Sequence, residues 1–363
     1  MNAERLHAIV IALNHEMKNR NIINKMQELL NALQNVINQP ISPHQQALSL
    51  NLKAMYACIS DTPSDNFSPA WRQILCEIGG ENLFGKNLKA NIENIFARNQ
   101  ITLAVALDEL QQLQKNLQAF NNALSQSSSA LLHFNIGDEK LAPGECEIGI
   151  LIPRDAVNNQ LLDFADELKE LGFILNTFSE VVTGKNDELS IRTISSSDLV
   201  VYLQAAAPYA ACIAVAIERV VSLYKQLLEI RKLSGEIRKQ GVPDEEMTGI
   251  EKHANQLMEN GIEKIAVDIV NTYHKKEDKG RKHELTTAVR FSLNKIANRI
   301  DHGFNIEVRV EPVTKNKDEK EDKDLESAIE AIQGATTNMQ FMKLEGQPIL
   351  KLPEIKDKSK KKE

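Results

Sequence analysis

The 363-residue sequence is poor in several features that would point to a particular chemistry or compartment. Aromatic residues make up only 5% of it, so Leu, Ile, Val and Ala must supply most of the apolar filling, which favours packed helices over a large all-β core. The longest apolar stretch, 205–217, contains Pro208 and is shorter than the roughly 20 residues that span a bilayer. The N-terminus lacks the basic start and apolar core of a signal peptide. We therefore expect a soluble, cytoplasmic protein without a membrane partner.

An excess of basic residues is also missing. The formal net charge is -7 and the pI is about 5.7. Non-specific binding to nucleic acid needs a basic footprint, so we do not expect nucleic acid to bind the surface as a whole. The exception is the lysine-rich end, Lys356 to Lys362, which offers a local basic contact, although a short charged end is more often a solubilising tail.

Motifs for metal, cofactor or catalysis are absent as well. The four cysteines are far apart, form no CxxC pair and have no histidine at ligand spacing, which is typical of a reducing compartment: Cys58, Cys76, Cys146 and Cys212. His15-Glu16 is followed by Asn19 where HExxH needs histidine, and Thr183-Gly184-Lys185 lacks the upstream glycine of a phosphate loop. We expect no metal, no cofactor and no catalytic residue, which favours a non-enzymatic protein without deciding the question.

A serine nucleophile is the remaining catalytic hypothesis. The serines at 195–197 have Asp301 and His302 only as distant candidates for orienter and base, and no GxSxG elbow is present. Serines before a strand are ordinarily turn residues. We therefore interpret His302 as the end of a helix, where a cation is favoured.

The first third of the chain has the three-and-four spacing of amphipathic helices, and we predict a helical bundle over residues 1–129. Its clearest periodicity is a narrow seam of the kind that packs against another helix, formed by Leu103, Leu110, Leu113, Leu117, Phe120 and Leu124. The serine-rich run 125–129 is expected to end this region. Two partners for the seam stay open: the helix at 6–37 of the same chain, or the same helix of a second copy.

Beyond the bundle the period changes to 2, the spacing of strands. We predict strands at 145–152, 173–182, 189–194 and 199–203, with a helix at 161–171 between the first two, and a return strand at 304–310. Long helices are expected at 208–239, 244–274 and 281–302. The fold class is α+β and predominantly helical, with a ferredoxin-like βαββ(β) sheet packed by long helices in a second domain, 144–313.

The C-terminal part changes composition sharply. Residues 314–324 are almost all charged and predict a solvated linker. Residues 325–363 are expected to hold a short helix at 325–333, an extended docking segment at 347–352, and the lysine-rich tail.

One sheet edge has the composition of an anion site. If strands 145–152 and 173–182 run parallel through a right-handed crossover, their C-terminal ends lie on the same edge. Arg154, Asp155, Thr183 and Lys185 would then meet near a helix N-terminus, whose free N–H groups bind anions. The alternative is two solvated loops.

Residues 144–233 carry a resemblance to known proteins. The run GECEIGILIPRD, a helix, and LSIRTISSSDLVVYL leading into a helix that ends KQLLEIRKL resemble an uncharacterised bacterial protein family, and the order is similar to the TRADD-N-like domains of bacterial immunity proteins. The chain has Ser197-Asp198 where those domains usually have Ser-Pro. The resemblance implies an adaptor or assembly role, in defence against phage, without an active site.

Two functions are consistent with these patterns. The first is a non-enzymatic interaction or assembly protein that self-associates or docks a partner through its helices, in a homo-oligomer or a heteromeric complex. The second is a sensor or enzyme that acts on an anionic small molecule or nucleotide at the Arg154/Lys185 edge.

Overall fold

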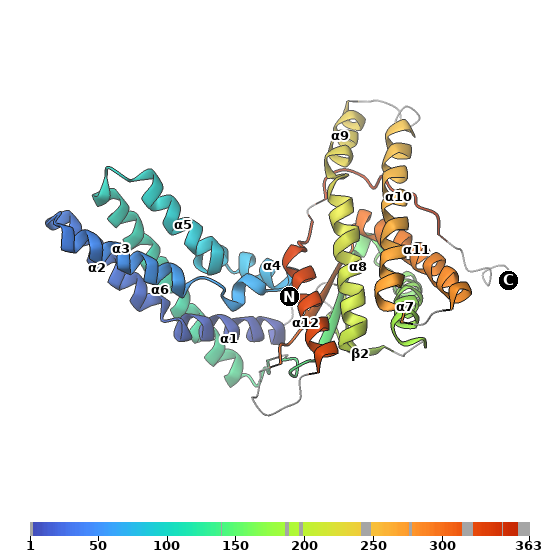
Figure 1. The fold of residues 1–363 in the computed structure, drawn as a ribbon, viewed down its shortest axis with the longest axis horizontal. Coiled ribbons are helices and arrows are strands. Elements are labelled where there is room, and N and C mark those ends of the chain that lie inside the picture. The colour runs from blue at the N-terminus through green and yellow to red at the C-terminus, as the bar shows by residue number, and fades with distance from the viewer. Residues whose placement is uncertain are drawn as a thin grey trace. The chain divides into compact units, whose positions relative to one another are not determined.

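The computed structural model describes residues 3–138, 140–185, 189–195, 199–240, 248–275, 278–313, 322–342 and 344–354. The fold is α+β and predominantly helical, as predicted (Figure 1). The chain divides into two compact units, Met1–Lys140 (unit 1) and Leu141–Glu363 (unit 2).

Unit 1 is a helical bundle. Its helices are α1 Ala3–Asn19, α2 Ile22–Asn38, α3 Ser42–Cys58, α4 Pro69–Glu77, α5 Gly85–Arg98 and α6 Leu103–His133, with short 3-10 turns at Pro63–Asn66 and Glu81–Leu83. The break between α1 and α2 falls at Asn21, which has a φ of 55°, a left-handed conformation that asparagine tolerates better than most residues. The Ser68 hydroxyl accepts the Trp71 N–H and caps α4, with Pro69 at the first helical position.

The expected end of the bundle at the serine run is wrong, because α6 continues through it. The Ser129 hydroxyl donates to the Ser125 carbonyl oxygen one turn earlier, at 3.0 Å. Serine side chains disfavour helices when they bond to the backbone in non-helical conformations. Here the side-chain bond is to a carbonyl oxygen of the preceding helical turn, so the helix continues. Unit 1 consequently extends beyond residue 129.

Unit 2 holds a four-stranded antiparallel sheet in the order β2-β3-β1-β4. Its elements are β1 Cys146–Leu151, α7 Leu161–Thr183, β2 Ser190–Ser195, β3 Val200–Ala205, α8 Ala207–Lys225, α9 Leu228–Lys239, α10 Thr248–Tyr273, α11 Lys279–Asp301, β4 Asn305–Val310 and α12 Lys323–Asn338, with a 3-10 turn at Arg154–Val157. This is the ferredoxin-like strand order, and four helices lie among the described residues between β3 and β4. Ile148 lies opposite Leu203 and Val308, so the three strands present aliphatic side chains in one row.

The predicted strand at 173–182 is wrong: this stretch is the second half of α7. The buried side chains Leu171, Ile174, Leu175, Phe178 and Val181 have helical spacing and face the core. The helix α7 runs through Gly172 without a break, and a Cβ at this position would meet nothing within 4 Å.

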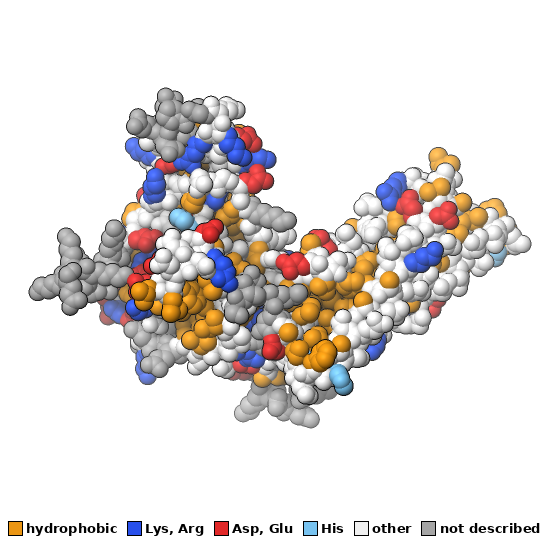
Figure 2. Space-filling view, turned by 180° about the vertical axis from the view of Figure 1, so that it is seen from behind, with side chains coloured by type: hydrophobic (Ala, Val, Ile, Leu, Met, Phe, Trp, Pro, Cys, Tyr) orange, Lys and Arg blue, Asp and Glu red, His pale blue; other side chains and the backbone are white. Residues whose placement is uncertain are grey.

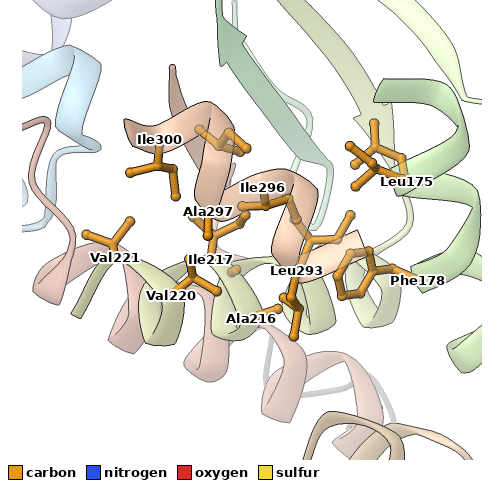
Figure 3. Packing of buried hydrophobic residues seen from close by; sticks show 14 of the residues in the cluster. Leu175, Phe178, Ala216, Ile217, Val220, Val221, Leu293, Ile296, Ala297 and Ile300 are labelled. Carbon is orange, nitrogen blue, oxygen red and sulfur yellow. The ribbon is translucent and has the colours of Figure 1, made fainter. Parts of the chain in front are cut away.

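The core of unit 2 lies between α8, α11 and α7, where the side chains of the three helices interdigitate (Figure 3). The predicted helix 208–239 is two helices, α8 and α9, separated at 226–227. Among the described helices α8 is the one long and apolar enough to cross a membrane, and 67% of its 18-residue apolar window is buried inside the protein. Its apolar surface is therefore used by the core.

The C-terminal part belongs to the same unit. Asp322 caps α12, so the last residues of the predicted linker 314–324 are helical, while 314–321 lie outside the described residues, as does the tail 356–362. The helix packs on α8 and β4, and the Thr336 hydroxyl donates to the Val308 carbonyl oxygen at 3.0 Å. The β4 edge of the sheet is thereby covered by the chain itself.

Candidate functional site

The residues of the predicted anion site do not converge. Arg154 and Asp155 precede α7, whereas Thr183 ends it and Lys185 follows. The 23-residue helix α7, about 33 Å long at a rise of 1.5 Å per residue, lies between the two pairs in the chain. The reason is the wrong strand assignment, because the predicted meeting required two parallel strands.

The local chemistry at Lys185 also differs from the prediction. The Thr183 hydroxyl donates to the carbonyl oxygens of Ser179 and Lys185, both at 3.0 Å, around a helix C-terminus. A helix C-terminus presents carbonyl oxygens and a partial negative charge, which attract cations. Arg154 donates to Asn159 at 2.9 Å.

The predicted interface seam is packed inside unit 1. Leu110, Leu113, Leu117 and Leu124 are buried, and Leu103 and Phe120 are partly buried against the same core. The facing helices are α1 and α2 of the same chain. The first of the two partners left open by the sequence is therefore the one in the structure.

The flanks of the seam are amides that also pair within the chain. Gln114 of α6 donates to Gln27 of α2 at 2.8 Å, and Gln27 donates to Asn31 at 2.9 Å. On the face seen in Figure 2, unit 1, at the right, presents mostly uncharged side chains with few acidic or basic ones. This surface offers no charge pattern that identifies a partner.

The acidic and histidine side chains considered for metal binding or catalysis are placed as follows in the part of the chain that the structure describes. Within it no group of three or more His, Cys, Asp or Glu side chains could hold a metal ion. His302 is exposed and its ring bonds to the Asn298 carbonyl oxygen at 2.7 Å, while the neighbouring Asp301 is fully buried. The two side chains therefore do not contact the same groups, and Asp301 belongs to a different, buried site.

That site is a groove of α9, α10 and α11 that holds residues 344–354, which we call the strap. The strap forms neither helix nor strand. Ile349, Leu350 and Leu352 insert their side chains into the core and are 0%, 3% and 4% exposed. Aliphatic anchors of this kind, each about 1.5–3 kcal/mol when fully buried, supply the apolar part of the contact.

Two asparagine side chains each bind one N–H group and one carbonyl oxygen of the strap backbone. Asn298 of α11 accepts the Leu352 N–H at 3.0 Å and donates to the Leu352 carbonyl oxygen at 3.1 Å. Asn255 of α10 accepts the Lys351 N–H at 2.7 Å and donates to the Ile349 carbonyl oxygen at 3.4 Å. An amide side chain has a donor and an acceptor side by side, so it can replace a neighbouring strand as the partner of an extended backbone.

A buried charged pair holds the middle of the strap. Asp301 receives the Ile349 and Leu350 N–H groups on one oxygen, at 2.6 and 2.7 Å. Its other oxygen accepts from Arg231 of α9 at 2.6 Å and from the Tyr224 hydroxyl. Burial, and then the Asp301 charge, raise the pKa of Tyr224 well above its usual range, so the hydroxyl stays a donor.

Arg231 binds the beginning of the strap. It donates to the Glu345 carbonyl oxygen at 3.0 Å and to the Gly346 carbonyl oxygen at 2.8 Å. Both Arg231 and Asp301 are almost completely buried, at 4% and 0% exposure. Charges buried in this way need partners, and here the strap backbone supplies part of them.

Further along, Asn294 donates to the Pro353 carbonyl oxygen at 3.0 Å. Nine backbone groups of the strap bond to side chains of α9, α10 and α11. The polar contact is therefore directed mainly at the backbone, which any extended peptide shares, while the apolar anchors provide selectivity.

The sequence reasoning missed the side chains of this groove. Asn294, Asn298 and Asp301 follow one another at steps of four and three along α11, a polar stripe beside an apolar face. Arg231 stands seven residues, about two helical turns, after Tyr224, and both side chains are buried. Polar residues at core positions were the available signal, since buried polar groups must find partners.

Comparison with known proteins adds no relative: no protein family, curated protein or solved structure matches this chain. The similarity to TRADD-N-like domains stays a prediction that none of these comparisons tests. The proposals below consequently depend on the geometry of the groove alone.

Proposed function

We propose that the protein is a non-enzymatic interaction protein whose unit 2 binds an extended segment of a protein partner in the groove that the strap occupies. The observation that supports this most is the paired donor and acceptor bonding of Asn255 and Asn298 to the strap backbone. In peptide recognition by strand addition, backbone bonds give affinity and side-chain pockets give specificity, and this groove offers both kinds of contact.

The strap is then an internal ligand that a partner replaces. A tethered segment has an effective concentration of about millimolar, so a partner competes only if it binds well or is itself held at high local concentration. The cytoplasmic setting, and assembly as a homo-oligomer or heteromeric complex in bacterial defence, stay proposals of the same kind.

The test uses the full chain with a protease site inserted after Met342 and cut after folding, so that the strap stays bound without a covalent link. A fluorescent peptide of residues 344–354 is added and its anisotropy measured. We expect saturable exchange with the native strap. Far-UV circular dichroism of the uncut protein verifies the fold.

Substitutions in the groove test whether peptide binding depends on the asparagine side chains. Asn298→Ala removes a donor and an acceptor, about 1–3 kcal/mol together, and should make the bound labelled peptide dissociate roughly 5-fold to 150-fold faster. Asn271→Ala, an exposed position on α10, is the matched control and should change nothing. Absence of exchange, or an equal dissociation rate of the labelled peptide in both variants, would refute the proposal.

A further inference from the structure

We infer that the groove selects partners by a sequence pattern: glycine, two variable residues, two aliphatic residues, one variable residue, then an aliphatic residue followed by proline. In the strap these positions are Gly346, Ile349, Leu350, Leu352 and Pro353. This inference rests on the proposed function and specifies the class of peptide that the same groove takes.

The glycine is required where the strap crosses α9. Gly346 has a φ of +80°, a left-handed conformation that costs other residues energy. A Cβ there would lie 3.3 Å from the Arg231 carbonyl oxygen and 3.5 Å from the Gly235 Cα. On the other side, a Cβ on Gly235 would lie 3.2 Å from the Gly346 Cα. Two glycines therefore permit the close approach, one from the groove and one from the ligand.

The aliphatic pair is selected by backbone and side chain together. Asp301 accepts the N–H of both Ile349 and Leu350, so neither position accommodates proline, which has no N–H. Both side chains are buried among apolar residues, so a polar side chain would lose its hydration without gaining a partner. These two positions fix the register of the ligand.

The groove restricts the last three positions of the pattern, 351 to 353, to different degrees. The Lys351 side chain is 77% exposed, which leaves that position variable. Leu352 is buried and gives both backbone groups to Asn298, which excludes proline there. Pro353 contributes only its carbonyl oxygen, to Asn294, and proline also restricts the residue before it to an extended conformation. Proline thus fits position 353 and preorganises Leu352.

The cleaved full-length protein described above tests this pattern with a panel of synthetic strap peptides, each competing with the labelled one. Because only the peptide changes, no variant disturbs the fold of the protein. Gly346→Ala should weaken competition roughly tenfold, and Leu350→Pro roughly tenfold to hundredfold. Gln347→Ala, an exposed position of the same peptide, is the matched control and should compete as well as the unchanged peptide.

The outcomes separate the two proposals. If the unchanged peptide does not bind, the proposed function fails. If it binds but Gly346→Ala and Leu350→Pro bind equally well, the groove recognises peptides without this pattern and the inference is overturned. A loss for both variants together with an unaffected Gln347→Ala supports it.

Discussion

Replacing Asp301 by asparagine tests the buried centre of the groove with almost no change of shape. The substitution removes the negative charge that Arg231 faces at 2.6 Å in a site where both side chains are almost fully buried. It also places an NH₂ group where one oxygen now accepts the N–H of Ile349 and Leu350, or where the other accepts from Arg231 and Tyr224. Either orientation of the amide leaves donors facing donors.

The expected cost follows from these contacts. Leaving one member of a buried ion pair without its partner costs about 3–5 kcal/mol. An unsatisfied buried N–H adds about 1–3 kcal/mol. Their sum, about 4–8 kcal/mol, is comparable to the entire stability of an ordinary domain, about 5–15 kcal/mol. We therefore expect unit 2 of the Asp301→Asn variant to be close to unfolding in water.

A matched control exists in the same unit. Asp268 faces Arg219 at 3.4 Å, but its side chain is 63% exposed and that of Arg219 is 40% exposed. An exposed ion pair contributes about 0–1 kcal/mol. Asp268→Asn makes the same chemical change, so it should shift the urea midpoint of unit 2 only slightly.

The two units can be followed separately during urea unfolding. Trp71 is the only tryptophan and lies in unit 1, so its fluorescence reports on that unit, whereas far-UV circular dichroism reports on both. Asp301→Asn should lower the denaturant midpoint seen by circular dichroism and leave the tryptophan transition in place. A shift no larger than that of Asp268→Asn would refute the role given to the buried pair.

Three further predictions concern the rest of the fold. Gly172→Ala should raise the stability of unit 2 by about 0.5–1 kcal/mol in thermal unfolding, because the position is mid-helix with open space around the new Cβ; a loss would argue against a continuous α7. In α10, Gly261→Ala should cost about 1–3 kcal/mol, because the Cβ would overlap Leu223, whereas Gly249→Ala meets nothing within 4 Å and should be neutral or stabilising; similar urea midpoints for the two variants would contradict the close packing of α10 on α8. Burial raises the pKa of Glu16 above its ordinary value, so the folded state holds this proton more tightly, and the resulting stability is present below the ordinary pKa and lost as pH rises through the folded value. Tryptophan-detected urea midpoints should therefore show unit 1 gaining stability between pH 7 and pH 4 relative to Glu16→Gln, and a constant difference would contradict this.

Much of the fold could be predicted from local patterns. Strands β1, β2, β3 and β4 were predicted correctly, because alternating apolar residues and flanking breakers agree at these places. The stretch 173–182 was wrongly predicted to be a strand, because the spacing of its apolar residues fits both the strand period and the helix period. Tertiary packing decides whether such a short apolar run forms a helix or a strand, and here Phe178 packs into the core of unit 2 as part of a helix.

The groove could be predicted only in part. Residues 347–352 were expected to form an extended docking segment, and in the structure residues 349–352 bond to helices of their own chain without forming a helix or strand. Arg231 and Asp301 were not identified because they are 70 residues apart and meet only after α8, α9 and α11 pack. A sequence shows that a polar residue stands at a core position, but the identity of its partner depends on the fold.

Hydrogen exchange of the strap amides in the intact, ¹⁵N-labelled chain tests the central claim, that the strap occupies a replaceable binding site. The Ile349, Leu350 and Leu352 N–H groups should exchange slowly in the free protein, since each is hydrogen-bonded. Addition of unlabelled strap peptide at several millimolar, to compete with the tethered segment, should accelerate exchange at these three amides and leave those of α11 protected. Unchanged protection of the strap, at peptide concentrations that saturate the cleaved protein, would show that the strap is a fixed part of the core and would contradict the account.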